Sequence, residues 1–167
     1  CCHSLGADSV IRRQYRSDIE AIVAKRHDNR GDYWASPDGR VGVGSPFNTL
    51  ECVLMLSDLG MNRTDPVLKG ASKLILGCWR DDGRFRLAPK ASIYPCHTIG
   101  AARVLCRVGY AEDRKLQRTF EHLLATVHVD GGWRCKTFKY GRGPETEFSN
   151  PGPTLDALDG FRFTKNI

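Results

Sequence analysis

The sequence predicts an all-α fold in which helical hairpins repeat along the chain. Apolar residues recur at the three- and four-residue spacing of a helix, and no segment shows the alternation of a half-buried strand. A turn with the pattern Asp-Gly-(Arg or Gly)-apolar also occurs three times, at intervals of about 45–50 residues. A period of this size is typical of helical solenoids, propellers and closed helical arrays. The turns begin at Asp38, Asp82 and Asp130.

The first helix is expected near Ser17. Residues 17–20 read SDIE, the pattern of a capping box, and Ile19, Ile22 and Val23 share one helical face. Residues 1–16 would form an N-terminal extension. Residues 17–167 would form a single repeat domain, with units at about 17–48, 49–97 and 98–153 and a partial unit at 154–167.

Each later unit is expected to open with a threonine before an apolar helix, at Thr49, Thr98 and Thr154. The second helices of the two complete hairpins should begin at Asp65-Pro66 and at Asp113. Glycines at the ends of the first helices should stop them, namely Gly60 and Gly109. The apolar faces include Leu56, Ile75, Leu105, Phe120, Leu123, Leu124 and Val127.

The seven cysteines favour a reducing compartment. Their number is odd, no Cys-x-x-Cys pair occurs, and 167 residues can bury a core without disulfides. We therefore expect a cytoplasmic protein. Cys52, Cys78 and Cys106 fall on apolar helical faces and are expected to be small buried residues.

The formal net charge is +6, and the basic residues are scattered rather than gathered into a stripe. Solvated helix faces explain this distribution best, and binding of nucleic acid or another polyanion is the less favoured interpretation. No run of about 18 apolar residues occurs, so no membrane span is expected.

Two aligned segments resemble a known repeat. Residues 116–133 (LQRTFEHLLATVHVDGGW) and 68–85 (LKGASKLILGCWRDDGRF) resemble the repeat of the prenyltransferase and squalene–hopene cyclase superfamily. The chain is also similar to the N-terminal half of bacterial proteins described as prenyltransferase-like repeat proteins. The resemblance implies an α/α toroid, which two and a half hairpins would leave incomplete. We expect self-association, or further chain, to cover the open ends.

The resemblance also implies where chemistry would lie. The superfamily lines its cavity from the start of the helices that are Thr-led here, and cyclases place Asp-x-Asp-Asp before that Thr. This chain lacks those aspartates, which argues against acid cyclase chemistry. Protein prenyltransferases bind zinc through an Asp-x-Cys pair and a later His; Cys96 matches the Cys, whereas Tyr94 replaces the Asp. Cys96, His97 and Cys135 are therefore candidate zinc ligands, the alternative being structural cysteines and a surface histidine.

Two further sets of candidates remain. Phe47, Tyr94 and Trp133 would line an isoprenoid-type cavity if they face inward. The loop at 136–153 is the longest between a turn and its helix, and long loops on rigid scaffolds often bind ligands. Its polar candidates are Arg142, Glu145, Glu147 and Asn150, the alternative being an ordered surface loop.

Two functional classes follow. The first is a prenyltransferase-like toroid that binds a small apolar, isoprenoid-like ligand beside a cysteine-based metal site. The second is a non-catalytic helical scaffold that binds protein or a polyanion through its basic surface. The sequence leaves open whether the protein is an enzyme.

Overall fold

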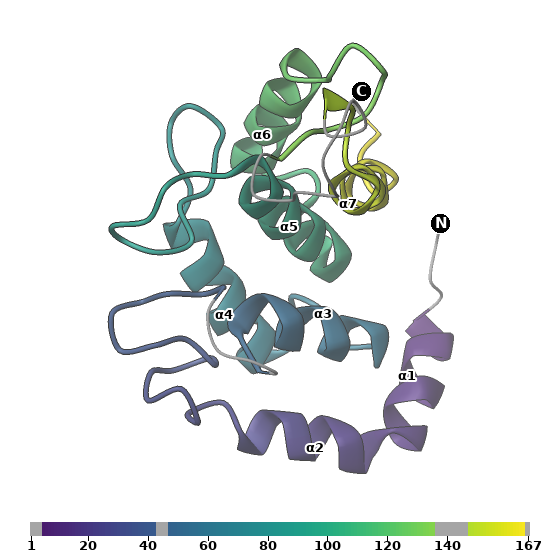
Figure 1. Cartoon of the computed structure of the whole chain (residues 1–167). Helices are drawn as coiled ribbons and strands as arrows, with labels where there is room; N and C mark the ends of the chain where they lie inside the picture. Colours follow the sequence, from purple (N-terminus) through teal and green to yellow (C-terminus); the bar gives the residue numbers. More distant parts are fainter. Residues whose placement is uncertain (1–4, 43–46, 136–146, 166–167) are drawn as a thin grey trace.

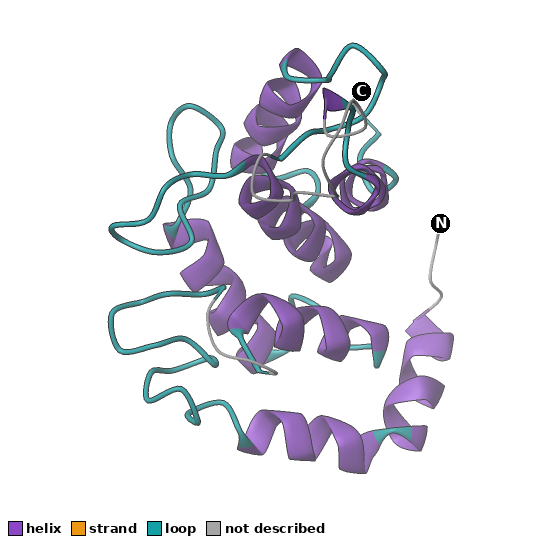
Figure 2. Cartoon of the chain, in the orientation of Figure 1, coloured by secondary structure: helices purple, strands orange, loops and turns teal. Residues whose placement is uncertain are grey.

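The computed structural model describes residues 5–42, 47–135 and 147–165, and these residues form an all-α fold. Within them there is no β-strand, only an isolated bridge between Trp79 and Phe85 (Figure 2). The helices are α1 (Leu5–Gln14), α2 (Arg16–Ala24), α3 (Thr49–Asp58), α4 (Pro66–Gly77), α5 (Pro95–Leu105), the π-helical turn η1 (Cys106–Tyr110), α6 (Arg114–Ala125) and α7 (Pro151–Phe161). The predicted all-α class is confirmed.

The helices stack roughly in chain order. Figure 1 shows α2 at the bottom of the view, α3 and α4 above it, and α5, α6 and α7 at the top. Contacts between elements follow the same order, from α2 with α3, through α3 with α4 and α5, to an extensive contact of α5 with α7. The loops after α2 and α4 lie on the same side of this stack. They are joined by a hydrogen bond from the N–H of Val41 to the carbonyl of Leu87, at 3.1 Å.

The three Asp-Gly turns fold in the same way. Each glycine has a φ between 77° and 87°, and its N–H donates to the carbonyl three residues earlier at 2.9 Å. The residue at that earlier position donates to the carbonyl four residues further on, at 2.8–3.2 Å. Glycine adopts such a φ without strain, which explains why Asp-Gly recurs at these places. The glycines are Gly39, Gly83 and Gly131.

The threonines of the second and third units bind the turn before their helix. The N–H of Phe85 donates to the hydroxyl of Thr98 at 3.2 Å, and the N–H of Trp133 donates to the hydroxyl of Thr154 at 3.0 Å. Both threonines were expected to open their helices, and that part of the prediction is wrong. The helices begin one turn earlier, at Pro95 and Pro151, because proline is well suited to the first helical position.

Thr49 was also predicted to cap its helix, and it does not. The cap of α3 is Asn48, whose side chain accepts a hydrogen bond from the N–H of Glu51 at 3.1 Å. Thr49 is the first residue of the helix, and its hydroxyl donates to the carbonyl of Tyr33 at 2.8 Å. The hydroxyls of all three threonines therefore hydrogen-bond the first turn of a helix to a preceding loop.

The predicted capping box at Ser17 is wrong as well. The helix α2 begins at Arg16, only one residue after α1 has ended at Gln14. The N–H of Tyr15 donates to the carbonyl of Ile11, and the N–H of Ile19 donates to the carbonyl of Tyr15, both at 3.0 Å. Helical hydrogen bonding thus runs from α1 into α2, and the start of α2 has no side-chain cap. Glu20 instead accepts from Arg16 at 2.7 Å.

The predicted N-terminal extension is largely helical and contacts the connection between α3 and α4. Arg12, in the last turn of α1, donates to the carbonyl of Gly60 at 2.6 Å and pairs with Asp65. Asp65 is the N-cap residue of α4, as predicted, although its carboxylate binds Arg12 and the N–H of Asn62 rather than its own helix. The extension thus fastens to the α3–α4 connection.

The predicted apolar faces form the core, except at the end of α6. Leu56, Ile75, Leu105 and Phe120 are fully buried. Leu124 and Val127, however, are 46% and 40% exposed, because one lies at the edge of the apolar stripe and the other follows the end of the helix. That part of the predicted face is wrong.

The last helix carries exposed leucines. Leu155 and Leu158 of α7 are 66% and 53% exposed. An unpartnered apolar face at the end of a helical stack is what self-association would cover, and self-association stays a prediction. None of the helices in the described segments is long and apolar enough to cross a membrane.

Candidate functional site

Two of the candidate metal ligands lie side by side. The sulfur atoms of Cys96 and Cys135 are 3.2 Å apart, although the residues are 39 positions apart in the chain. Cys96 is half-buried in the first turn of α5, and Cys135 is fully buried two residues after Trp133. The separation is longer than a disulfide bond, which is about 2.0 Å, and the two residues are thiols.

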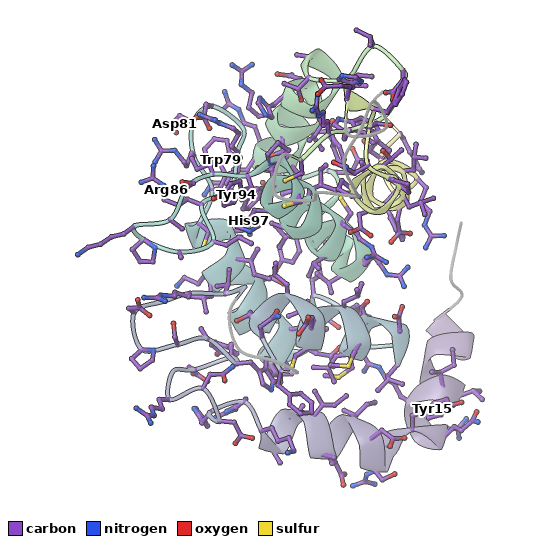
Figure 3. The ribbon with its side chains drawn as sticks, viewed as in Figure 1. Tyr15, Trp79, Asp81, Arg86, Tyr94 and His97 are labelled. Atoms are coloured by element: carbon purple, nitrogen blue, oxygen red, sulfur yellow. The ribbon has the colours of Figure 1, made fainter. Side chains whose placement is uncertain are left out.

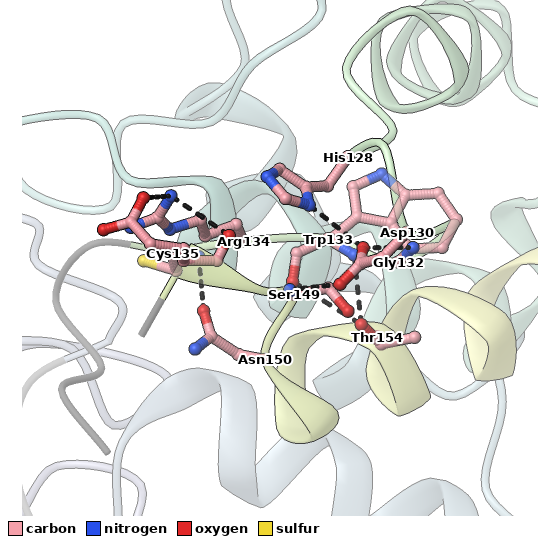
Figure 4. Close-up of polar contacts among 10 residues, drawn as sticks. His128, Asp130, Gly132, Trp133, Arg134, Cys135, Ser149, Asn150 and Thr154 are labelled. Atoms are coloured by element: carbon pink, nitrogen blue, oxygen red, sulfur yellow. Dashed lines mark hydrogen bonds and ion pairs between the residues drawn. The ribbon is translucent and has the colours of Figure 1, made fainter. Parts of the chain in front are cut away.

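The position of Cys135 is fixed by the start of α7 (Figure 4). Its N–H donates to the side-chain oxygen of Asn150 at 2.6 Å, and the N–H of Asn150 donates to the carbonyl of Trp133 at 2.9 Å. Asn150 is 4% exposed and is the N-cap residue of α7. The candidate residue Asn150 therefore positions the backbone of the cysteine, which is a structural role.

Asp130 holds the third turn against the same segment. Its carboxylate accepts from the N–H of Ser149 at 2.7 Å, from His128 at 3.0 Å and from the N–H of Gly132 at 3.3 Å (Figure 4). These hydrogen bonds, that from Ser149 foremost, lower the pKa of Asp130 to about 2. The charged carboxylate thus connects the turn to the residues before α7 by hydrogen bonds.

The lowered pKa of Asp130 predicts a pH-dependent contribution to stability. A folded-state pKa near 2 lies below the usual 3.8, so the contribution is complete above about pH 5 and is progressively lost as the pH falls from there towards 2. Asp130→Asn should lower the melting temperature by a few degrees at pH 6, and the difference from wild type should shrink towards pH 2. Thermal unfolding monitored by circular dichroism at each pH measures this. Asp81→Asn, in the second turn, is the control; a difference that is constant with pH at Asp130 would contradict the prediction.

His97 does not join the two cysteines in a metal-binding group. Its ring lies edge-on to Tyr94, with centroids 5.1 Å apart, and its Nδ1 is buried without a hydrogen-bond partner among the described residues. Burial lowers the pKa of His97, which favours the neutral ring.

The two sulfurs do not match a zinc site as they stand. Tetrahedral zinc with Zn–S bonds of about 2.3 Å holds two thiolates about 3.8 Å apart, farther than the 3.2 Å seen here. In the described part of the chain, no three His, Cys, Asp or Glu side chains gather to hold one metal ion. The described residues therefore provide a thiol pair here and not the three or four ligands that zinc requires.

The candidates in the long loop are only partly covered by the structure. Arg142 and Glu145 lie outside the described residues. Glu147 is exposed and accepts from Arg134 at 3.2 Å, an ion pair at the surface. Surface pairs of this kind contribute little to stability, so Glu147 has no evident chemical role.

The three candidate cavity aromatics lie in different surroundings. Trp133 is 5% exposed, its ring stacks on Phe161 with centroids 5.5 Å apart, and its indole N–H donates to the carbonyl of Leu123 at 2.9 Å. It is therefore a core residue. Phe47 is half-buried and lies 5.1 Å from the ammonium of Lys25, and Tyr94 contacts His97.

A cleft that the sequence pattern did not predict lies beside α4. Its volume is about 740 Å³, and it is lined by the loop at 31–39, by one face of α4 and by the start of the following loop. The lining includes the rings of Tyr33 and Trp79 and the cations Lys73 and Arg86. Figure 3 shows Trp79 and Arg86 on the loop that follows α4.

Part of the cleft is lined by the backbone of α4 at two glycines, which have no side chains. Gly70 and Gly77 of α4 both line it, and they are one heptad apart, so they share a helical face. A Cβ atom on Gly70 would strike the ring of Tyr33, whereas one on Gly77 would meet nothing within 4 Å. This glycine spacing is the sequence signal that could have indicated a cleft over α4.

The wall formed by residues 30–34 is strained. Arg30, Tyr33 and Trp34 have φ values of 69°, 52° and 60°, in the left-handed region that residues with a side chain rarely adopt. The carbonyl of Tyr33 accepts from Thr49, and the indole N–H of Trp34 donates to the carbonyl of Ile22 at 3.1 Å, so the conformation is held from two sides. Strain of this kind is often found where a binding site is preorganised.

Two cations in the cleft have no acidic partner in the described segments. The Nε of Arg86 is buried without a hydrogen-bond partner, and neither Arg86 nor Lys73 forms an ion pair with a described residue. A buried guanidinium N–H without a partner is costly, and an anionic ligand would satisfy it. Asp32, Asp38 and Arg80 also line the cleft, but each forms an ion pair with another residue: Asp32 with Arg26, Asp38 with Arg40 and Arg80 with Asp82. The cleft thus combines aromatic rings with the two cations Lys73 and Arg86.

Comparison with known proteins gives no relative. No protein-family model, curated protein sequence or solved structure matches this chain.

Proposed function

We propose that this protein is a prenyltransferase-like helical-repeat protein, of α/α-toroid type, that binds a small organic anion with an apolar part in the cleft beside α4. The repeat assignment is supported by the three turns with equivalent hydrogen bonds and by the equivalent contacts of Thr98 and Thr154. The isoprenoid-like character of the ligand rests on the resemblance of residues 68–85 and 116–133 to the superfamily repeat.

The observation that carries the proposal is that Arg86 and Lys73 line the same cleft as two aromatic rings. Among the described residues, the buried Nε–H of Arg86 has no hydrogen-bond partner and Lys73 forms no ion pair. Tyr33 and Trp79 offer apolar surface within the same cleft. A ligand with one anionic group and one apolar group would satisfy both features.

The alternative of a polyanion-binding scaffold is less well supported. Many basic side chains pair with neighbouring carboxylates, which neutralises the positive charge locally. Examples are the pairs Arg16–Glu20, Arg40–Asp38, Arg84–Asp82, Arg103–Asp159 and Arg118–Glu121. A continuous basic face would need these cations unpaired.

Two fluorescent probes test the cleft. Anilinonaphthalene sulfonate has an apolar ring system and one anionic group, and N-phenylnaphthylamine is the same framework without the charge. The variant Arg86→Gln combined with Lys73→Gln should weaken sulfonate binding about tenfold and leave the uncharged probe unaffected, because a charge-assisted hydrogen bond is lost. Gly77→Leu should weaken both probes, since its side chain would fill open space in the cleft.

The matched control is Arg84→Gln. Arg84 lies in the same loop and carries the same charge, but it pairs with Asp82 at 2.7 Å and does not line the cleft. It should bind both probes as wild type does. Equal sulfonate affinity in wild type and in the Arg86/Lys73 variant would contradict the anion site, and unchanged binding in Gly77→Leu would contradict the cleft.

A further inference from the structure

The thiol pair is separate from the cleft and is not used by the proposed function. Cys96 and Cys135 do not line the cleft, and their sulfurs lie 3.2 Å apart. The pair joins two elements that are distant in the chain, the first turn of α5 and the segment between the third turn and α7. We propose that Cys96 and Cys135 form a redox-active dithiol, which an external disulfide such as glutathione disulfide oxidises to an intramolecular disulfide.

The two thiols differ in accessibility, which assigns their roles. Cys96 is half-buried, so an external disulfide reaches its sulfur first. It is the second residue of α5, where the positive end of the helix dipole favours an anionic sulfur. Cys135 is fully buried beside it and is the thiol that resolves the intermediate.

The reaction balances without any further reagent. The Cys96 thiolate attacks one sulfur of the external disulfide, forming a mixed disulfide and releasing one thiol. The Cys135 sulfur, having lost its proton to solvent, then attacks the sulfur of Cys96 and releases the second thiol. Two protein thiols are oxidised and one external disulfide is reduced to two thiols.

The geometry needs only a small movement. The sulfurs must approach from 3.2 Å to about 2.0 Å. The backbone of Cys135 is already fixed by the hydrogen bond to Asn150, at 2.6 Å, so the movement falls on the side chains. Because the new bond closes a loop of 39 positions, oxidation should raise the melting temperature by about 5–10 °C.

The other three described cysteines do not compete, although Cys78 is only half-buried and not buried as expected. Burial raises the pKa of Cys52 and of Cys106 to about 12, and it also raises the pKa of Cys78. These three residues therefore stay protonated near neutral pH and react slowly with disulfides.

The experiment treats the reduced 167-residue chain, with Cys1 and Cys2 changed to Ser, with glutathione disulfide. The remaining thiols are then blocked with N-ethylmaleimide, and the protein is examined by intact mass and by peptide mapping. The expected product has lost two thiols, retains no glutathione and contains a peptide cross-linked between Cys96 and Cys135. Its melting temperature should exceed that of the reduced protein.

Variants separate the two roles. Cys135→Ala should retain one glutathione on Cys96, because the resolving thiol is gone. Cys96→Ser should lose thiols about tenfold more slowly, since its remaining partner is buried. Cys78→Ser, whose side chain can keep the hydrogen bond to the carbonyl of Leu74, is the matched control and should form the cross-link as the parent does.

Three results would overturn the inference. One is stable glutathione on Cys96 in the parent protein without a cross-link. Another is loss of thiols that is equally fast in Cys96→Ser. The third is stoichiometric zinc binding by the reduced protein that requires both cysteines and blocks oxidation, which would make the pair a metal site. None of these results depends on whether the cleft binds the two probes.

Discussion

Replacing Gly83 by Ala is expected to lower the free energy of unfolding by about 3 kcal/mol, whereas the same change at Gly39 or Gly131 should cost about 1–2 kcal/mol. The three glycines occupy the same place in equivalent turns, with φ values of 83°, 77° and 87°. An alanine at any of them adopts the left-handed region, which costs a similar amount each time.

Only the second turn adds a clash. A Cβ atom on Gly83 would lie 2.7 Å from the backbone carbonyl oxygen of Arg118 in α6, whereas at Gly39 and Gly131 it would meet nothing within 4 Å. A backbone oxygen cannot move without shifting its helix, so the turn and α6 must separate. Glycine is therefore required at position 83 for two reasons: its positive φ and the close approach of the turn to α6.

Urea denaturation of the three Ala variants measures these differences. The two open turns act as internal controls, because they carry the same change in the same conformation. A cost at Gly83 no greater than at Gly39 and Gly131 would show that the second turn does not dock on α6 as closely as described.

The sequence pattern predicted most helices because their signals are local. Proline after Asp65, the cap at Asp113 and glycines at 60 and 109 act on the backbone where they stand. Gly60 and Gly109 do have positive φ values, of 84° and 102°. The apolar spacing correctly placed most of the buried helix faces, Leu124 and Val127 at the end of α6 being the exceptions.

The threonine caps were wrong because the same residue type serves two purposes. A hydroxyl at a helix start can accept from its own helix or from another segment, and the pattern does not tell these apart. Thr98 and Thr154 accept from the N–H of Phe85 and of Trp133, each in the turn before its helix. The interaction depends on tertiary contacts between loop and helix.

The candidate sites were predicted to different extents. Cys96, at a helix start, and Cys135, just after the next turn, were singled out as residues that a hairpin could bring together, and their sulfurs do lie 3.2 Å apart. The cleft depends instead on the backbone of Tyr33 and on two loops that meet in space. A φ of 52° at a tyrosine has no sequence signature, so the pattern could not predict this wall.

Replacing Trp133 by Ala should have the largest effect on stability, a loss of about 3–5 kcal/mol in the free energy of unfolding. Trp133 packs between α6 and α7, stacked on Phe161 and bonded to the carbonyl of Leu123. It is 5% exposed, so its removal would leave a cavity where the last two helices meet the third turn. If Trp133 instead lined a ligand cavity, its replacement would weaken ligand binding and change the free energy of unfolding little.

The variant Trp133→Phe separates the two roles. Phenylalanine keeps a ring to pack on Phe161, and the carbonyl of Leu123 still accepts from the N–H of Thr126 at 3.1 Å. Its cost should therefore be about 1–2 kcal/mol, and its affinity for anilinonaphthalene sulfonate should equal that of wild type, because Trp133 does not line the cleft. Urea denaturation and probe titration measure the two quantities on the same samples. Weakened probe binding with unchanged stability would assign Trp133 to a ligand cavity instead of the core.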